Sequence, residues 1–133
     1  LQLFIGEKKT FAIEYEGKVI GSLGIERYEE EKLPEFAPLK GRELGFVLSK
    51  NFWGRGLMPE AVRRVVRYLF EEAGLEFLVC GHYVENQQSC RVQEKCGFRH
   101  YRLVKTKTSY GEEKDCWLSV LCPRGEKAPE EII

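Results

Sequence analysis

The sequence predicts an α/β (α+β) fold, in which helices pack on a mixed, mostly antiparallel sheet with a central parallel strand pair. Segments with strand and helix patterns follow in the order strand, strand, strand, helix, strand, helix, strand, strand. Strand-helix-strand connections occur only in the middle, which favours a parallel pair there and antiparallel pairs elsewhere. A length of 133 residues suits one core. We expect one domain over residues 1–122, followed by a charged tail over 123–133.

The first two strands are predicted to form a hairpin. Residues 11–15 and 19–25 are rich in strand formers, and residues 16–18 between them contain a glycine suited to a turn. Gly21 and Gly24 indicate a bulge or a close approach of another backbone.

A polar loop and a third strand are predicted next. Residues 28–40 contain Pro34 and Pro38 and predict a loop, and residues 43–48 predict a strand. The loop is acidic, which is typical of a solvated surface but can also attract a cationic amine. Its glutamates are Glu29, Glu30, Glu31 and Glu35.

The second half predicts two helices and three strands. Apolar residues recur at helical spacing over 59–73, and Gly74 suits the helix end. Residues 75–84 are apolar on both faces and predict a buried strand. Asn86 can cap a short helix that ends near Cys96 and Gly97. The last two strands are predicted over 99–108 and 115–121, with a turn over 109–111.

Composition excludes several classes of protein. Basic and acidic residues balance at 21 each, which argues against broad binding of nucleic acid or an anionic membrane. Five cysteines without a C-x-x-C pair argue against a disulfide framework or a zinc site, and the two histidines add little to a metal hypothesis. No apolar run is long enough to span a membrane. The sequence therefore predicts a reduced, cytoplasmic protein.

Gly54 and Gly56 lie between a predicted strand and a predicted helix. Glycine permits positive φ and leaves no side chain between backbone and ligand, so successive amides can form a concave nest for an anion. The following helix adds its own free N–H groups, and Arg55 adds charge. The pair alone is equally typical of a tight turn. It matches neither the phosphate-binding P-loop nor the dinucleotide fingerprint.

A second motif makes a specific interpretation of the glycine turn possible. The first motif reads Asn51-x-x-Gly54-x-Gly56, and the second reads Asn86-x-x-Ser89 followed by Lys95-Cys96-Gly97-Phe98. With both motifs in order, residues 43–120 resemble GNAT-family acetyltransferases, and most of all the ribosomal-protein (Rim-type) N-terminal acetyltransferase branch.

The resemblance implies acetyl-CoA as co-substrate, no metal, and splayed central strands between which the pantetheine arm lies. It places Asn86 and Ser89 near the thioester, with Ser89 protonating the leaving thiolate. The residues it assigns to the cofactor are Phe52, Trp53, Gly54, Arg55, Gly56, Leu57, Asn86 and Ser89. Two features depart from the family: Asn51 replaces Gln or Arg, and most of the N-terminal strand and helix pair is missing or shortened.

The general base has several candidates. Glu43 ranks first and His82 second, with Glu85 as a third. The alternative interpretation is a surface carboxylate for Glu43 and a hydrogen-bonded core histidine for His82. A cysteine nucleophile at Cys80 or Cys90 is less favoured than inert packing.

The implied function is direct acetyl transfer to a primary amine, either a small molecule or a protein N-terminus. Two alternatives stay open: a non-catalytic acyl-CoA-binding module, and an α/β interaction domain whose glycine turn is only a turn. We expect no nucleic-acid or membrane partner, and a homodimer is an assembly to be tested.

Overall fold

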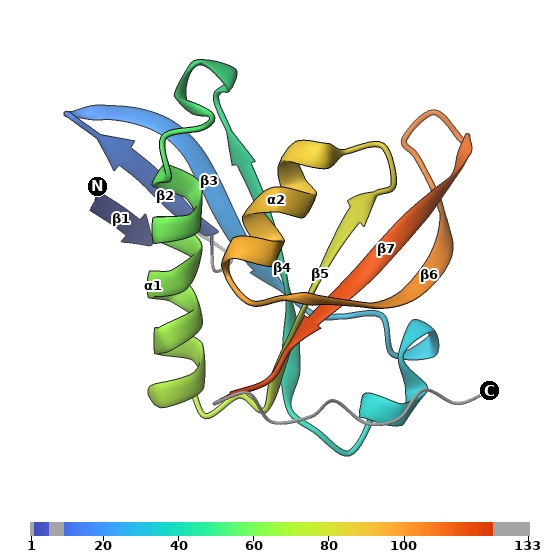
Figure 1. Cartoon of the computed structure of the whole chain (residues 1–133). Helices are drawn as coiled ribbons and strands as arrows, with labels where there is room; N and C mark the ends of the chain where they lie inside the picture. Colours follow the sequence, from blue (N-terminus) through green and yellow to red (C-terminus); the bar gives the residue numbers. More distant parts are fainter. Residues whose placement is uncertain (1, 6–9, 124–133) are drawn as a thin grey trace.

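The computed structural model describes residues 2–5 and 10–123, and within them seven strands form one sheet in the order β1-β2-β3-β4-β5-β7-β6 (Figure 1). The strands are β1 Gln2–Ile5, β2 Thr10–Tyr15, β3 Lys18–Glu26, β4 Gly41–Leu48, β5 Phe77–Tyr83, β6 Arg99–Lys107 and β7 Glu113–Leu121. The helices are α1 Leu57–Glu71 and α2 Gln87–Lys95, with short 3-10 turns η2 Glu30–Lys32, η3 Pro34–Phe36 and η4 Lys50–Phe52.

The predicted fold class and every predicted element are confirmed, with shifts of a few residues at their ends. Helix α1 begins at Leu57, two residues before the predicted start, because Gly56 in the left-handed conformation is its N-cap. Strand β1 was missed, since its short apolar run shows no alternation. The limit of the domain at residue 122 stays a prediction, and residues 124–133 of the expected tail lie outside the described part.

The predicted hairpin pairs β2 with β3 through a two-residue turn in which Glu16 and Gly17 have φ of 51° and 79°. The register shifts opposite Ile13 and Glu14, where β3 has one extra residue, Ile20, next to Gly21, so the predicted bulge is confirmed beside this glycine. The close approach is confirmed at Gly21, where a Cβ would overlap the Val47 carbonyl oxygen of β4.

Strands β4 and β5 are the only parallel neighbours in the described sheet, and they splay apart. They pair from Gly41↔Phe77 to Leu44↔Cys80 and no further. Beyond that point β4 stays paired with β3 as far as Leu48, and β5 stays paired with β7 as far as Tyr83. The facing edges of the two strands therefore open into a V.

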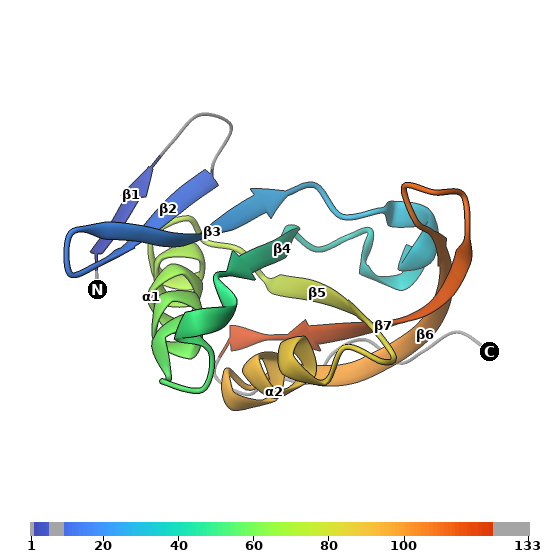
Figure 2. The same cartoon turned by 90° about the horizontal axis from the view of Figure 1, so that it is seen from above.

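The two faces of the sheet have different covers (Figure 2). Helices α1 and α2 bury one face, where a core forms around residues such as Leu44, Leu78 and Val62. Residues 28–40 cover part of the other face, with Leu33 and Phe36 buried. The prediction of a solvated loop is therefore wrong for these two residues, because their apolar side chains fill a second core.

A buried ion pair fastens this loop to the sheet. Arg102 of β6 donates to both carboxylate oxygens of Glu35 and to the carbonyl oxygen of Lys32. The Glu35 side chain is only 5% exposed. Glu35 thus holds the loop in place and is not part of a solvated acidic surface. Among the described residues, no helix is long and apolar enough to cross a membrane.

Candidate active site

The glycine turn leads from β4 into α1 and has the geometry of an anion nest. Gly54 and Gly56 have φ of 76° and 75°, and a Cβ at either position would meet no atom within 4 Å. Their backbone therefore faces open space. No side chain caps the N-terminus of α1, so its first N–H groups point toward the same region. Arg55 lies with its guanidinium carbon 5.2 Å from the centre of the Phe52 ring.

A cleft of about 260 Å³ runs beside this turn, at the open end of the V. One wall is formed by residues at the end of β4 together with Trp53. The indole Nε1 of Trp53 donates a hydrogen bond of 2.9 Å to the Leu48 carbonyl oxygen. The opposite wall is the first part of α2. The lining residues are Phe46, Val47, Leu48, Trp53, Met58, Asn86, Gln88, Ser89 and Val92. The two sequence motifs therefore meet across one cleft.

Asn86 caps α2 and so shapes the cleft. Its side-chain Oδ1 accepts a hydrogen bond of 3.0 Å from the Ser89 backbone N–H, as expected for an N-cap. With the oxygen used in this way, the side-chain amide NH₂ is the group that Asn86 offers to a ligand.

Gln93 orients the Ser89 hydroxyl, and sequence reasoning missed it. Its Nε2 donates to the Gly81 carbonyl oxygen at 3.2 Å and to Ser89 Oγ at 3.1 Å. The Gly81 carbonyl only accepts, which fixes the orientation of the amide. Because Ser89 Oγ accepts from Gln93, its own proton points away from Gln93, and Ser89 is one of the residues that line the cleft. The signal available in the sequence was the spacing of four residues, which places both side chains on one helix face.

This arrangement leaves one polar atom without a partner. Gln93 is 2% exposed, and its Oε1 is buried with no hydrogen-bond donor. An unsatisfied buried oxygen typically costs about 1–3 kcal/mol. Gln93 therefore lowers the free energy of unfolding through its unsatisfied oxygen while its amide nitrogen holds the Ser89 hydroxyl.

Glu43 lies across the sheet from Ser89. It is one residue before Leu44, so its side chain is on the face opposite the helices. There it lines a second cavity of about 90 Å³, together with Glu29, Lys32 and Gly81. Burial raises the pKa of the Glu43 carboxyl, and Glu29 and Glu26 raise it further against the opposing effect of Lys32.

The other catalytic candidates occupy different surroundings. His82 is buried, lines neither cavity, and is hydrogen-bonded to the Tyr83 carbonyl oxygen and to His100. Glu85 is exposed and forms an ion pair of 2.9 Å with Lys114. A hydrogen bond from Lys114 lowers the pKa of Glu85, which makes it a weak base.

The environments of Cys80 and Cys90 do not favour a thiolate in the metal-free protein. Cys80 Sγ donates to the Leu44 carbonyl oxygen at 3.2 Å, and complete burial raises its pKa strongly. Burial and the neighbouring Glu94 raise the pKa of Cys90. Neither thiol is therefore activated as a thiolate nucleophile.

The fold and the site together define an α/β domain with an anion nest and a splayed strand pair. These features agree with the class of protein that the two motifs indicate, the acyl transferases. Residues 4–99 match the family model described as Acetyltransferase (GNAT) domain, and the chain belongs to this family. The family prediction is confirmed.

Individual relatives agree with this assignment. The chain is 33% identical over 85 residues to FsC-acetyl coenzyme A-N(2)-transacetylase of Aspergillus fumigatus, a match that covers 64% of this chain and 36% of that protein. A GNAT-family acetyltransferase from Bacillus anthracis superposes with a TM-score of 0.71 at 25% identity, covering 86% of this chain and 66% of the other. The ribosomal-protein-S5-alanine acetyltransferase of Vibrio fischeri shares the fold, with a TM-score of 0.73 at 20% identity and coverage of 90% and 63%.

The matches cover only part of each curated relative. They span 36%, 30% and 42% of the lengths of three such proteins.

Proposed function

We propose that this protein transfers an acetyl group from acetyl-CoA directly to a primary amine. The observation that carries the proposal is the cleft at the open end of the β4–β5 V, with Ser89 in its wall and with Trp53 and Met58, which flank the glycine nest in sequence, among its lining residues. The coenzyme would supply an activated acetyl thioester at this place.

The chain offers the coenzyme two kinds of backbone contact. The amides around Gly54 and Gly56, with the first N–H groups of α1, suit the pyrophosphate. The edge of β4 beyond Leu44 faces no strand, so an extended arm that carries amides can pair with it as an added strand. The wall of Phe46 and Trp53 suits the apolar parts of that arm.

Ser89 is the proposed donor of the proton that the sulfur requires. As the C–S bond breaks, the electron pair goes to sulfur, and the Ser89 hydroxyl, whose proton points away from Gln93, can protonate it. Gln93 is then a positioning residue that acts through Ser89.

Glu43 is the proposed general base, with His82 as the lower-ranked candidate. The acceptor nitrogen forms its C–N bond to the acetyl carbon and releases a proton, which Glu43 can take directly or through water. A raised pKa suits this task, because the optimum for a base lies near the working pH. An α-amine with a pKa near ~8 needs only modest help to lose its proton.

The second cavity supports a cationic acceptor. Glu43 and Glu29 line it on the face opposite the coenzyme cleft, and among the described residues Lys32 is the one basic residue that lines it. An ammonium group, from a small molecule or a protein N-terminus, is the form in which the amine would first be attracted. A cytoplasmic location and a homodimer stay predictions.

A thiol-release assay against a panel of amines tests the proposal. Acetyl-CoA should raise the melting temperature, and at least one amine should yield free thiol in stoichiometric amount with acetylated product. Ser89→Ala should lower kcat by about 10²-fold, within the usual contribution of acid–base catalysis, and leave the Kd for acetyl-CoA within about twofold. Binding without turnover for any amine would favour the non-catalytic acyl-CoA-binding module. No binding at millimolar acetyl-CoA would refute both readings.

A further inference from the structure

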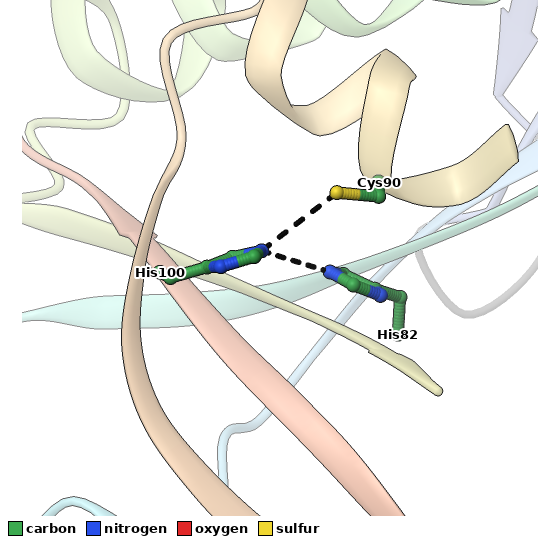
Figure 3. A group of neighbouring side chains, drawn as sticks. All are labelled: His82, Cys90 and His100. Carbon is green, nitrogen blue, oxygen red and sulfur yellow. Dashed lines mark hydrogen bonds between the residues drawn. The ribbon is translucent and has the colours of Figure 1, made fainter. Parts of the chain in front are cut away.

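Three potential metal ligands meet beside α2, outside both cavities. His82 of β5, Cys90 of α2 and His100 of β6 point toward one another (Figure 3), and their ligand atoms all lie within 4.8 Å of one another. His82 Nε2 is 3.2 Å from His100 Nε2, which is 3.7 Å from Cys90 Sγ. With Glu43 as the general base, no step of the proposed transfer requires this cluster, and a metal on His82 Nε2 would leave His82 without the lone pair that a base needs.

We propose that His82, Cys90 and His100 form a binding site for a divalent transition metal, with Zn²⁺ as the fitting ion. Zinc bonds of about 2.0–2.1 Å to nitrogen and 2.3 Å to sulfur give tetrahedral edges of roughly 3.3 Å between nitrogens and 3.6 Å between nitrogen and sulfur. The two separations that involve His100 differ from these by only about 0.1 Å. The third, between His82 Nε2 and Cys90 Sγ, is within 4.8 Å, so a small movement of these side chains brings all three ligand atoms to the ion.

The surroundings of the cluster prepare two of the ligands. His82 Nδ1 is 2.9 Å from the Tyr83 carbonyl oxygen, so Nδ1 carries the proton and Nε2 has a free lone pair for a metal. The His100 ring stacks on Trp117 with centroids 4.5 Å apart and planes 6° apart, which holds its orientation.

A water molecule would take the fourth tetrahedral position. Glu94 Oε1 lies 3.4 Å from Cys90 Sγ, but it is not among the ligand atoms that all lie within 4.8 Å of one another. Imidazole and thiolate favour zinc, copper or nickel over magnesium and calcium, which prefer oxygen alone. On binding, Cys90 gives up its thiol proton to solvent and the His100 proton moves from Nε2 to Nδ1.

The consequence is a cross-link between secondary-structure elements. An ion at this site joins α2 to β5 and β6, and α2 also carries Ser89. The proposal goes beyond acetyl transfer and stands whether or not that function does. It also differs from the expectation, drawn from sequence, of no metal.

Cobalt spectroscopy on the full chain, reduced and stripped of metal, tests the site. One equivalent of Co²⁺ should give a thiolate-to-metal charge-transfer band and the strong visible bands of tetrahedral coordination, and Zn²⁺ should displace it. Cys90→Ser should abolish the charge-transfer band. Cys122→Ser, another half-buried cysteine, should keep it. A band that survives in Cys90→Ser, or no band in the unmodified protein, overturns the proposal.

Thermal unfolding provides a second readout. Zn²⁺ should raise the melting temperature of the unmodified protein and of Cys122→Ser, and should do so far less in Cys90→Ser and His100→Gln. The loss of one ligand should weaken Zn²⁺ binding by at least about tenfold, since even the loss of a group that hydrogen-bonds a ligand typically costs 10–100-fold in metal affinity. Melting without metal shows that each variant folds. Equal stabilisation of all four proteins by Zn²⁺ would contradict the site.

Discussion

Gly54→Ala measures how much the glycine nest contributes to coenzyme binding, because a control substitution at a second glycine should destabilise the fold by the same amount. A Cβ at Gly54 would meet no protein atom, so the substitution adds only the strain of a left-handed alanine, about 1–2 kcal/mol. Gly111 in the β6–β7 turn has φ of 80° and is equally open. Both variants should therefore lose similar stability, with melting temperatures lower by about 3–8 °C for a chain of this length.

The two variants should differ in acetyl-CoA affinity. At Gly54 the added methyl group would project into the space that the pyrophosphate needs and displace it from at least one amide. A hydrogen bond to a charged group contributes about 1.5–3 kcal/mol, so the Kd should rise about ten- to hundredfold. Gly111→Ala should leave the Kd within about twofold. Isothermal titration calorimetry on both variants gives the comparison. Equal Kd values for the two would show that the turn does not hold the coenzyme.

Three further substitutions test other parts of the site and fold. Glu43→Gln should abolish the acidic limb of the kcat/KM pH profile. Burial raises the folded-state pKa of this carboxyl, so folding favours its protonated form. The free energy of unfolding of the unmodified protein is therefore highest in acid, where Glu43 is protonated, and falls as pH rises through that pKa. The variant should therefore be the more stable protein at neutral pH and lose that advantage in acid; a melting-temperature difference independent of pH would contradict this. Gln93→Leu should lower kcat by roughly tenfold through Ser89 without loss of stability, since it also removes an unsatisfied buried oxygen. Arg102→Leu should cost about 3–5 kcal/mol in urea unfolding by removing the guanidinium that pairs with the buried Glu35 carboxylate, and the double variant with Glu35→Leu should recover most of it.

The sequence contained enough information to predict the framework of the site. Apolar spacing located the first helix, the Asn86 cap and Gly97 located the second, and most positive-φ positions were recognisable because they are glycines, with Glu16 as an exception. Asn86 as a helix cap and the splay of the central strands also followed from motif and resemblance. These features depend on a few neighbouring residues, or on a pattern that the chain shares with its family.

Contacts between distant segments were beyond the sequence. The ion pair between Glu35 and Arg102 joins residues 67 positions apart, and no local pattern announces it. The cluster of His82, Cys90 and His100 lacks any metal-ligand spacing, because its members come from three elements that only the sheet order brings together. Such contacts depend on strand order and register.

The V between β4 and β5 has a kinetic consequence. It gives the sheet a gap with a separate chamber on each side, one beside Ser89 and the other beside Glu43. Two reactants that enter from opposite sides do not obstruct each other, so neither has to leave before the other binds. We therefore expect ternary-complex kinetics, with intersecting double-reciprocal plots when both concentrations are varied. If the chamber beside Glu43 receives the amine as proposed, its lining can diverge in evolution to suit new amines without changing the residues that bind the donor.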